Sequence, residues 1–201
     1  MGDIVMHQPN ETPEALGYQQ AGHAVMSYII RCGLSLNDEW RPIDLSLVLP
    51  PFHQVSIEGP TGDWGETTFS LGSLVTAPQV LLAGVAAQQL YQGQITDTVP
   101  PDLDIARKAR NLLGGYLSEY SEDTPYTERE KLSMEWLQQI FDHVKFHVQT
   151  FWPTVTALAS QLIEHKSLTE AEAFEVIETT LTPQQLEKAR DVQREYPENF
   201  G

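Results

Sequence analysis

The sequence predicts a mainly helical protein of the α+β class, with a small antiparallel β-sheet inserted after the first helix. Long stretches on both sides of residues 43–71 carry apolar residues at helical spacing and end at glycine or proline. Residues 43–71 instead form short runs of strand-like residues that are separated by Gly/Pro clusters. With 201 residues, of which 41% are hydrophobic, the chain is long enough for one good core or two small ones.

The first helix is predicted to begin at Thr12-Pro13 and to run to about Cys32. Thr12 offers an N-cap hydroxyl, and Pro13 falls in the first turn, where its missing N–H costs nothing. Gly33, which follows, is a usual residue at the C-terminal end of a helix. The preceding residues 1–11 are predicted to form a loose polar tail.

Three short strands are predicted after this helix. The first has an apolar residue at every second position, which indicates one buried face; these residues are Ile43, Leu45, Leu47 and Leu49. Pro50-Pro51 ends this strand. The segments "HQVSIEG" and "WGETTFSL" are predicted to be the second and third strands, joined by the turn cluster "GPTGD".

The rest of the chain is predicted to be helical. Helices are expected from Ala77 to Gly93, from Asp102 and from about Thr127, and Pro153 either breaks the last of these or begins its successor.

Two further helices are predicted from their N-terminal residues. Thr169 and Glu172 form a capping-box pattern, and Thr182-Pro183 begins a last, highly charged helix. The predicted organisation has three parts: a polar tail (1–11), one domain (12–181), and a charged C-terminal helix and tail (182–201).

The chain is strongly acidic, with 28 Asp and Glu against 12 Lys and Arg, a formal net charge of −16 and a pI of about 4.6. Such a surface repels phosphate backbones and anionic lipid headgroups, which argues against nucleic-acid and membrane partners. No Gly-x-x-x-x-Gly-Lys-Ser/Thr loop occurs, so no ATP site is expected. Because Cys32 is the only cysteine and the N-terminus has no secretory pattern, we expect a soluble protein of the reducing cytoplasm.

The stretch "LGYQQAGHAV" within the first predicted helix departs from a zinc-hydrolase signature at two positions. The pattern His-Glu-x-x-His places two metal-binding imidazoles on one helix face, with a glutamate that takes a proton from the zinc-bound water. In this frame His23 is the second histidine, Gln19 replaces the first histidine, and Gln20 replaces the glutamate. An amide is a poor zinc ligand and cannot act as a general base, so the substitutions keep the helix and remove the reaction.

The segment "YQQAGHAVMSYII" resembles the metal-binding helix of the peptidase domain of FtsH-type ATP-dependent zinc proteases, which usually contains Tyr-His-Glu-Ala-Gly-His-Ala. Three further segments are similar to this family and follow in the family's order: "PFHQVSIEGPTGDWGETTF", "LLAGVAAQQLYQG" and "DLDIARKAR". The resemblance covers roughly residues 12–181 and implies a helical peptidase-like fold. The motor domain and the membrane anchors of the family are not found in this chain.

The resemblance assigns roles to particular positions. It implies that His23 and Asp102 correspond to two zinc ligands, that Gln19 is a vestigial ligand position and that Gln20 is a vestigial general-base position. Two glutamines, Gln88 and Gln89, stand where the family has paired glutamates, and Val85 stands where it has an arginine. Two remaining ligands are too few for a stable zinc site, so no cofactor is expected.

A second histidine pair, His143 and His147, lies four residues apart on a predicted helix. The favoured interpretation is a solvated helix face. The alternatives are a separate two-histidine surface site and a contribution to the former zinc site.

These observations give three functional hypotheses. The first is a catalytically inactive homologue of the FtsH-type peptidases that binds a peptide or protein, since a retained sheet edge could pair with an extended peptide. The second is an active zinc metalloendopeptidase that uses a non-standard ligand or base, with zinc as its cofactor. The third is a structural or assembly protein, for which self-association into a homo-oligomer is plausible because the family's motor-bearing members form rings.

Overall fold

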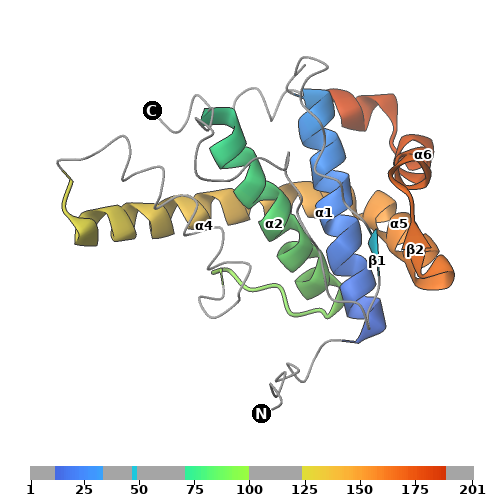
Figure 1. Ribbon diagram of the computed structural model, residues 1–201, viewed down its shortest axis with the longest axis horizontal. Coiled ribbons are helices and arrows are strands. Elements are labelled where there is room, and N and C mark those ends of the chain that lie inside the picture. Colours follow the sequence, from blue (N-terminus) through green and yellow to red (C-terminus); the bar gives the residue numbers. More distant parts are fainter. Residues whose placement is uncertain (1–11, 34–46, 49–70, 100–123, 189–201) are drawn as a thin grey trace, which may run out of the picture.

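The computed structural model describes residues 12–33, 47–48, 71–99 and 124–188, and this part of the chain is mainly helical, as predicted (Figure 1). The predicted second and third strands fall almost entirely outside the described residues. The helix that was predicted to begin at Asp102 also lies outside them.

Helix α1 spans Pro13–Gly33, in agreement with the predicted bounds. The backbone N–H of Ala15 donates a hydrogen bond to Thr12 Oγ1 at 3.2 Å, and the N–H of Leu16 donates to the Thr12 carbonyl at 3.0 Å. Thr12 therefore satisfies donors that the first turn of a helix would otherwise leave unpaired, which confirms the predicted cap.

Helix α2 spans Leu71–Tyr91 and begins earlier than predicted. The prediction ended a strand at Leu71 and placed Pro78 in the first helical turn, but Pro78 lies inside the helix. The pattern explains the difference, because Leu71, Leu74 and Val75 already have helical i, i+3, i+4 spacing. At the other end, Gly93 has a positive φ of 66°, a conformation that glycine adopts without strain.

Three helices make up most of residues 124–188, the described part of the C-terminal half: α4 (Tyr126–Thr150), α5 (Trp152–His165) and α6 (Glu170–Thr180). The interpretation that Pro153 begins a successor helix is confirmed, because Phe151 alone separates α4 from α5. Residues 183–188 are again helical, as predicted. The side chain of Leu186 packs against the core, so the described start of this last helix lies on the rest of the protein.

Two short strands, β1 (Leu47–Val48) and β2 (Ser167–Leu168), pair in antiparallel fashion, with Leu47 opposite Leu168. β1 falls within the first predicted strand. Its partner was not predicted as a strand and lies between α5 and α6, far along the chain. Two residues are too few to show a clear alternation of apolar and polar positions, which is why the sequence did not reveal β2.

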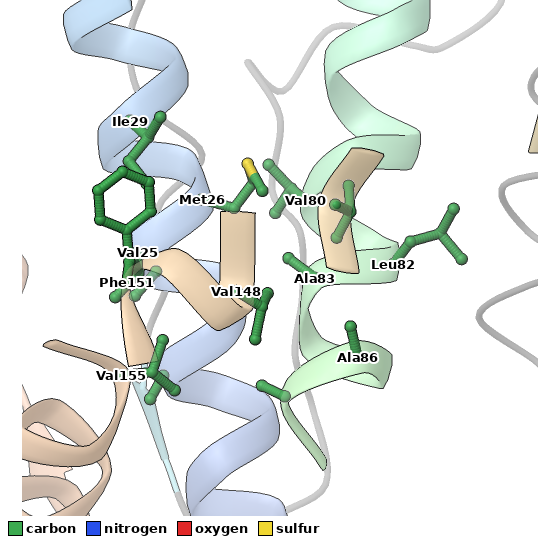
Figure 2. Packing of buried hydrophobic residues seen from close by; sticks show 14 of the residues in the cluster. Val25, Met26, Ile29, Val80, Leu82, Ala83, Ala86, Val148, Phe151 and Val155 are labelled. Carbon is green, nitrogen blue, oxygen red and sulfur yellow. The ribbon is translucent and has the colours of Figure 1, made fainter. Parts of the chain in front are cut away.

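The core is built around α1, which packs on both α2 and α5, while α2 also packs on α4. Figure 1 shows α1 and α2 side by side and running in opposite directions, with α4 crossing them. Figure 2 shows the side chains that meet between these helices. They come from α1 (Val25, Met26, Ile29), α2 (Val80, Leu82, Ala83, Ala86) and the α4–α5 junction (Val148, Phe151, Val155), and each is at most 6% exposed.

The capping box of α6 is present as predicted. Thr169 Oγ1 accepts a hydrogen bond from the Glu172 N–H at 3.3 Å, and the Glu172 carboxylate accepts one from the Thr169 N–H at 2.7 Å. We expect Thr169→Ala to lower the free energy of unfolding by about 1 kcal/mol, because the N–H of Glu172 loses its acceptor. Urea denaturation measures this change. The substitution Thr156→Ala, in the interior of α5, is the matched control, and an equal loss there would contradict the capping role.

Candidate functional site

Gln19, Gln20 and His23, which the resemblance aligns with a zinc motif, lie in the first half of α1. His23 is 2% exposed and Gln20 is 5% exposed, while Gln19 is partly exposed. Two of the three motif side chains are therefore enclosed by the protein. Asp102, the remaining position that the resemblance implies, lies outside the described residues, so the structure neither brings it to His23 nor separates it.

The imidazole of His23 is held by helix α2. Its Nδ1 lies 2.7 Å from the carbonyl oxygen of Val80, and a carbonyl can only accept, so Nδ1 carries the proton and donates. The lone pair of the neutral ring is therefore on Nε2. Burial lowers the pKa of His23, and the bond to Val80, which favours the protonated ring, opposes this only in part.

The ring of His23 rests directly against Gly84 of α2. A Cβ at Gly84 would lie 2.7 Å from Nδ1 of His23, and Cε1 and Nε2 are the ring atoms that it would approach most closely. Glycine is required there because any side chain would overlap the ring. One residue earlier on α1, a Cβ on Gly22 would lie 2.6 Å from the backbone oxygen of Ala83. Small residues thus let the two helices approach closely.

This packing encloses the ring of His23. A Cβ at Gly84 would approach Cε1, Nε2 and Nδ1 together, so Gly84 covers one face of the ring, whereas the lone pair on Nε2 lies in the ring plane. Within residues 12–33, 47–48, 71–99 and 124–188, no group of three or more His, Cys, Asp or Glu side chains is arranged to hold a metal ion. In this arrangement His23 serves as a hydrogen-bonded packing residue between α1 and α2.

The side chain at the general-base position is enclosed and neutral. Gln20 Oε1 is buried and has no hydrogen-bond partner within the described part of the chain. A glutamate at this position would place a charge where a neutral amide is already without a partner, which costs more. Gln20 is therefore an uncharged residue in an enclosed position, and its amide cannot act as a general base.

Gln88 and Gln89, which the resemblance aligns with the family's paired glutamates, lie at the end of α2, where Gln89 makes hydrogen bonds. Gln89 Oε1 accepts hydrogen bonds from the N–H and the hydroxyl of Thr96, both at 3.3 Å, and so ties the end of α2 to the following loop. Gln88 is partly buried. Val85, at the family's arginine position, is 2% exposed. An arginine at Val85 would need an ionic partner that an apolar residue does not.

The interpretation of His143 and His147 as a solvated helix face is wrong. His147 is 1% exposed and His143 is partly buried, and their Nε2 atoms lie 3.1 Å apart. The reason is the position of α4, whose face with Phe141, Val144 and Val148 is covered by the core. Burial lowers the pKa of His143 to about 4, and burial, together with the charges of His143 and Lys188, lowers that of His147 to about 3.

A stack of three aromatic rings joins α1, α2 and α5. The ring of Tyr18 lies 4.3 Å from that of Tyr91 and 5.2 Å from that of Trp152, measured between centroids. Tyr18 and Trp152 are partly buried and pack against the core. Phe146, on α4, is instead 45% exposed. Tyr91 gave no signal because it stands just before a predicted helix end.

Comparison with models of known protein families and with curated proteins finds no match to this chain. Among the helices in the described part of the chain, none is both long enough and apolar enough to cross a membrane.

Proposed function

We propose that this chain is a catalytically inactive homologue of the FtsH-type zinc peptidases that functions by binding a peptide or protein. The main support for the proposal is the surroundings of Gln20 and His23. Gln20 is a buried neutral amide where the family has its base. The imidazole of His23 is hydrogen-bonded to the Val80 carbonyl and packed against Gly84. The family assignment itself rests on the resemblance of the sequence segments.

The tautomer of His23 supports descent from a metal-binding helix. Histidines that bind zinc almost always donate their other ring N–H to a carbonyl or carboxylate, which fixes the ring and leaves the second nitrogen free for the metal. The bond from Nδ1 to the Val80 carbonyl has this form. We infer that the orienting contact was kept for stability after the ligand and the base were replaced.

A groove between α5 and α6 supports the binding role. It has a volume of about 420 Å³ and is lined by Gln161, His165, Ser167, Leu168, Glu172, Glu175, Val176 and Thr179. β2 forms part of this lining, so an extended backbone segment borders the groove. Partly buried Leu168 and Val176 supply apolar surface, and the carboxylates of α6 supply polar contacts, which together suit a peptide.

The proposal is tested by measuring hydrolysis and binding on the same preparation. Hydrolysis of an unfolded, fluorescently labelled substrate is expected to be absent both with added zinc and with a chelator. A peptide library is expected to yield ligands whose binding is weakened by Glu175→Lys in the groove. The matched control is Glu187→Lys, an exposed glutamate that does not line the groove.

Two outcomes contradict the proposal. Hydrolysis that is abolished by a chelator and by His23→Gln would establish the metallopeptidase hypothesis instead. A library that yields no ligand, or ligands whose binding is equally weakened by Glu175→Lys and Glu187→Lys, would remove the groove as the binding surface.

A further inference from the structure

The His143–His147 pair is separate from the altered motif on α1 and has a geometry of its own. The two residues are one helical turn apart on α4, so their side chains lie on the same face. Their Nε2 atoms are 3.1 Å apart, and their ring centroids are 4.5 Å apart with an interplanar angle of 76°. The centroids are farther apart than the nitrogens, so the two Nε2 atoms are the parts of the rings that face each other.

We propose that His143 and His147 form a transition-metal site that binds Cu²⁺, or with lower affinity Ni²⁺, through both Nε2 atoms. Metal–imidazole bonds are about 2.0–2.1 Å long, so nitrogens 3.1 Å apart subtend an angle of about 100° at the ion. That angle lies between those of neighbouring ligands in square-planar and tetrahedral complexes. The present separation of the two nitrogens therefore suits chelation, and each ring only has to turn its Nε2 lone pair away from the other ring and toward the ion.

The surroundings hold His147 in position. Its ring lies parallel to that of Phe151, with centroids 6.0 Å apart and an interplanar angle of 7°, and Phe151 is itself 1% exposed. His143 is partly exposed, so water can complete the coordination from that side. A ligand that is fixed before binding loses little conformational entropy, which favours chelation.

Donor type decides which ion is bound. Two neutral imidazoles with water in the other positions favour Cu²⁺ over Ni²⁺ and Zn²⁺, following the usual order of divalent ions. In the metal-free pair, one Nε2 carries the proton of the hydrogen bond between the rings. Metal binding displaces that proton to solvent, and the same ring takes up a proton from solvent at Nδ1, so both Nε2 atoms supply a lone pair and the number of bound protons is unchanged. Because Nδ1 of His147 is buried, the partly exposed His143 is the ring that makes this exchange.

The test is a calorimetric titration of tag-free, chelator-treated protein with CuCl₂. We expect one Cu²⁺ per chain with two imidazole nitrogens in its paramagnetic resonance spectrum. His143→Gln, which removes the more exposed ligand and leaves the packed His147, is expected to weaken binding by about tenfold or more, since even changes beyond the direct ligands cost that much. His165→Gln, a histidine exposed on α5, is the matched control.

Two results would overturn the site. If wild-type protein does not bind Cu²⁺, the contact between the rings is a hydrogen bond and nothing more. If His143→Gln and His165→Gln bind Cu²⁺ as well as wild-type protein does, the ion is held elsewhere. Neither result bears on peptide binding or on hydrolysis, so the metal site is tested independently of the proposed function.

Discussion

Replacing Gly84 with alanine is expected to lower the free energy of unfolding by about 1–5 kcal/mol. The added Cβ would overlap the buried ring of His23, which is held in place by its bond to Val80. The overlap costs about 1–3 kcal/mol, and a displaced ring leaves buried polar groups unpaired, which costs about as much again. The better helix propensity of alanine returns only about 1 kcal/mol. Urea denaturation monitored by circular dichroism measures the net loss.

Gly17 of α1 provides the matched control for this prediction. A Cβ on Gly17 would lie 2.7 Å from Cγ1 of Ile163, a partly buried, β-branched side chain. The overlap displaces only apolar atoms and leaves no buried polar group unpaired, so after the gain in helix propensity Gly17→Ala is expected to cost about 0–2 kcal/mol, less than Gly84→Ala. If the two substitutions cost the same, the contact between His23 and Gly84 is not the constraint described above.

Acidification is expected to destabilise the protein as the pH falls below about 6.5. Burial lowers the pKa of His23, lowers that of His143 to about 4 and lowers that of His147 to about 3. In the unfolded chain each imidazole binds its proton near its ordinary value, so below that pH the unfolded state holds protons that the folded state lacks. The contribution of these histidines to the free energy of unfolding is therefore fully present above about pH 6.5. As the pH falls from there toward the folded-state pKa of each histidine, that histidine's contribution decreases by about 1.4 kcal/mol per pH unit.

The contribution of one histidine can be isolated by comparing pH dependences. Denaturation curves measured with a chelator between pH 7.5 and 5 are expected to show that the free energy of unfolding depends less steeply on pH for His147→Gln than for wild-type protein. The exposed His165 again provides the control, since His165→Gln is expected to keep the wild-type slope. Parallel curves for His147→Gln and wild-type protein would show that His147 accepts its proton equally well in both states.

Most helix boundaries could be predicted because local chemistry determines them. Thr12, Thr169 and Gly93 act through atoms only a few residues away, and all three end or begin helices as expected. The start of α2 was placed too late because Pro78 is a strong local signal for a helix start, and the apolar spacing before it was given less weight.

The surroundings of the candidate site could not be predicted because they depend on contacts between distant segments. The sequence identified His23, but nothing near it indicates that Gly84 and Val80 of another helix would enclose its ring. His143 and His147 were recognised as a pair from their spacing. Their burial depends on which face of α4 meets the core, and the three residues between them, Val144, Lys145 and Phe146, do not indicate which face that is.

The antiparallel pairing of β1 with β2 has a consequence for the order in which the protein folds. Leu47 and Leu168 are far apart in the sequence, so their pairing closes a long loop. The entropic cost of closing that loop is offset by only the few hydrogen bonds of two-residue strands. The α4–α5 junction at Phe151, by contrast, joins neighbouring segments. We therefore expect the β1–β2 link to form late on the folding pathway, after α1 has collapsed onto its neighbouring helices.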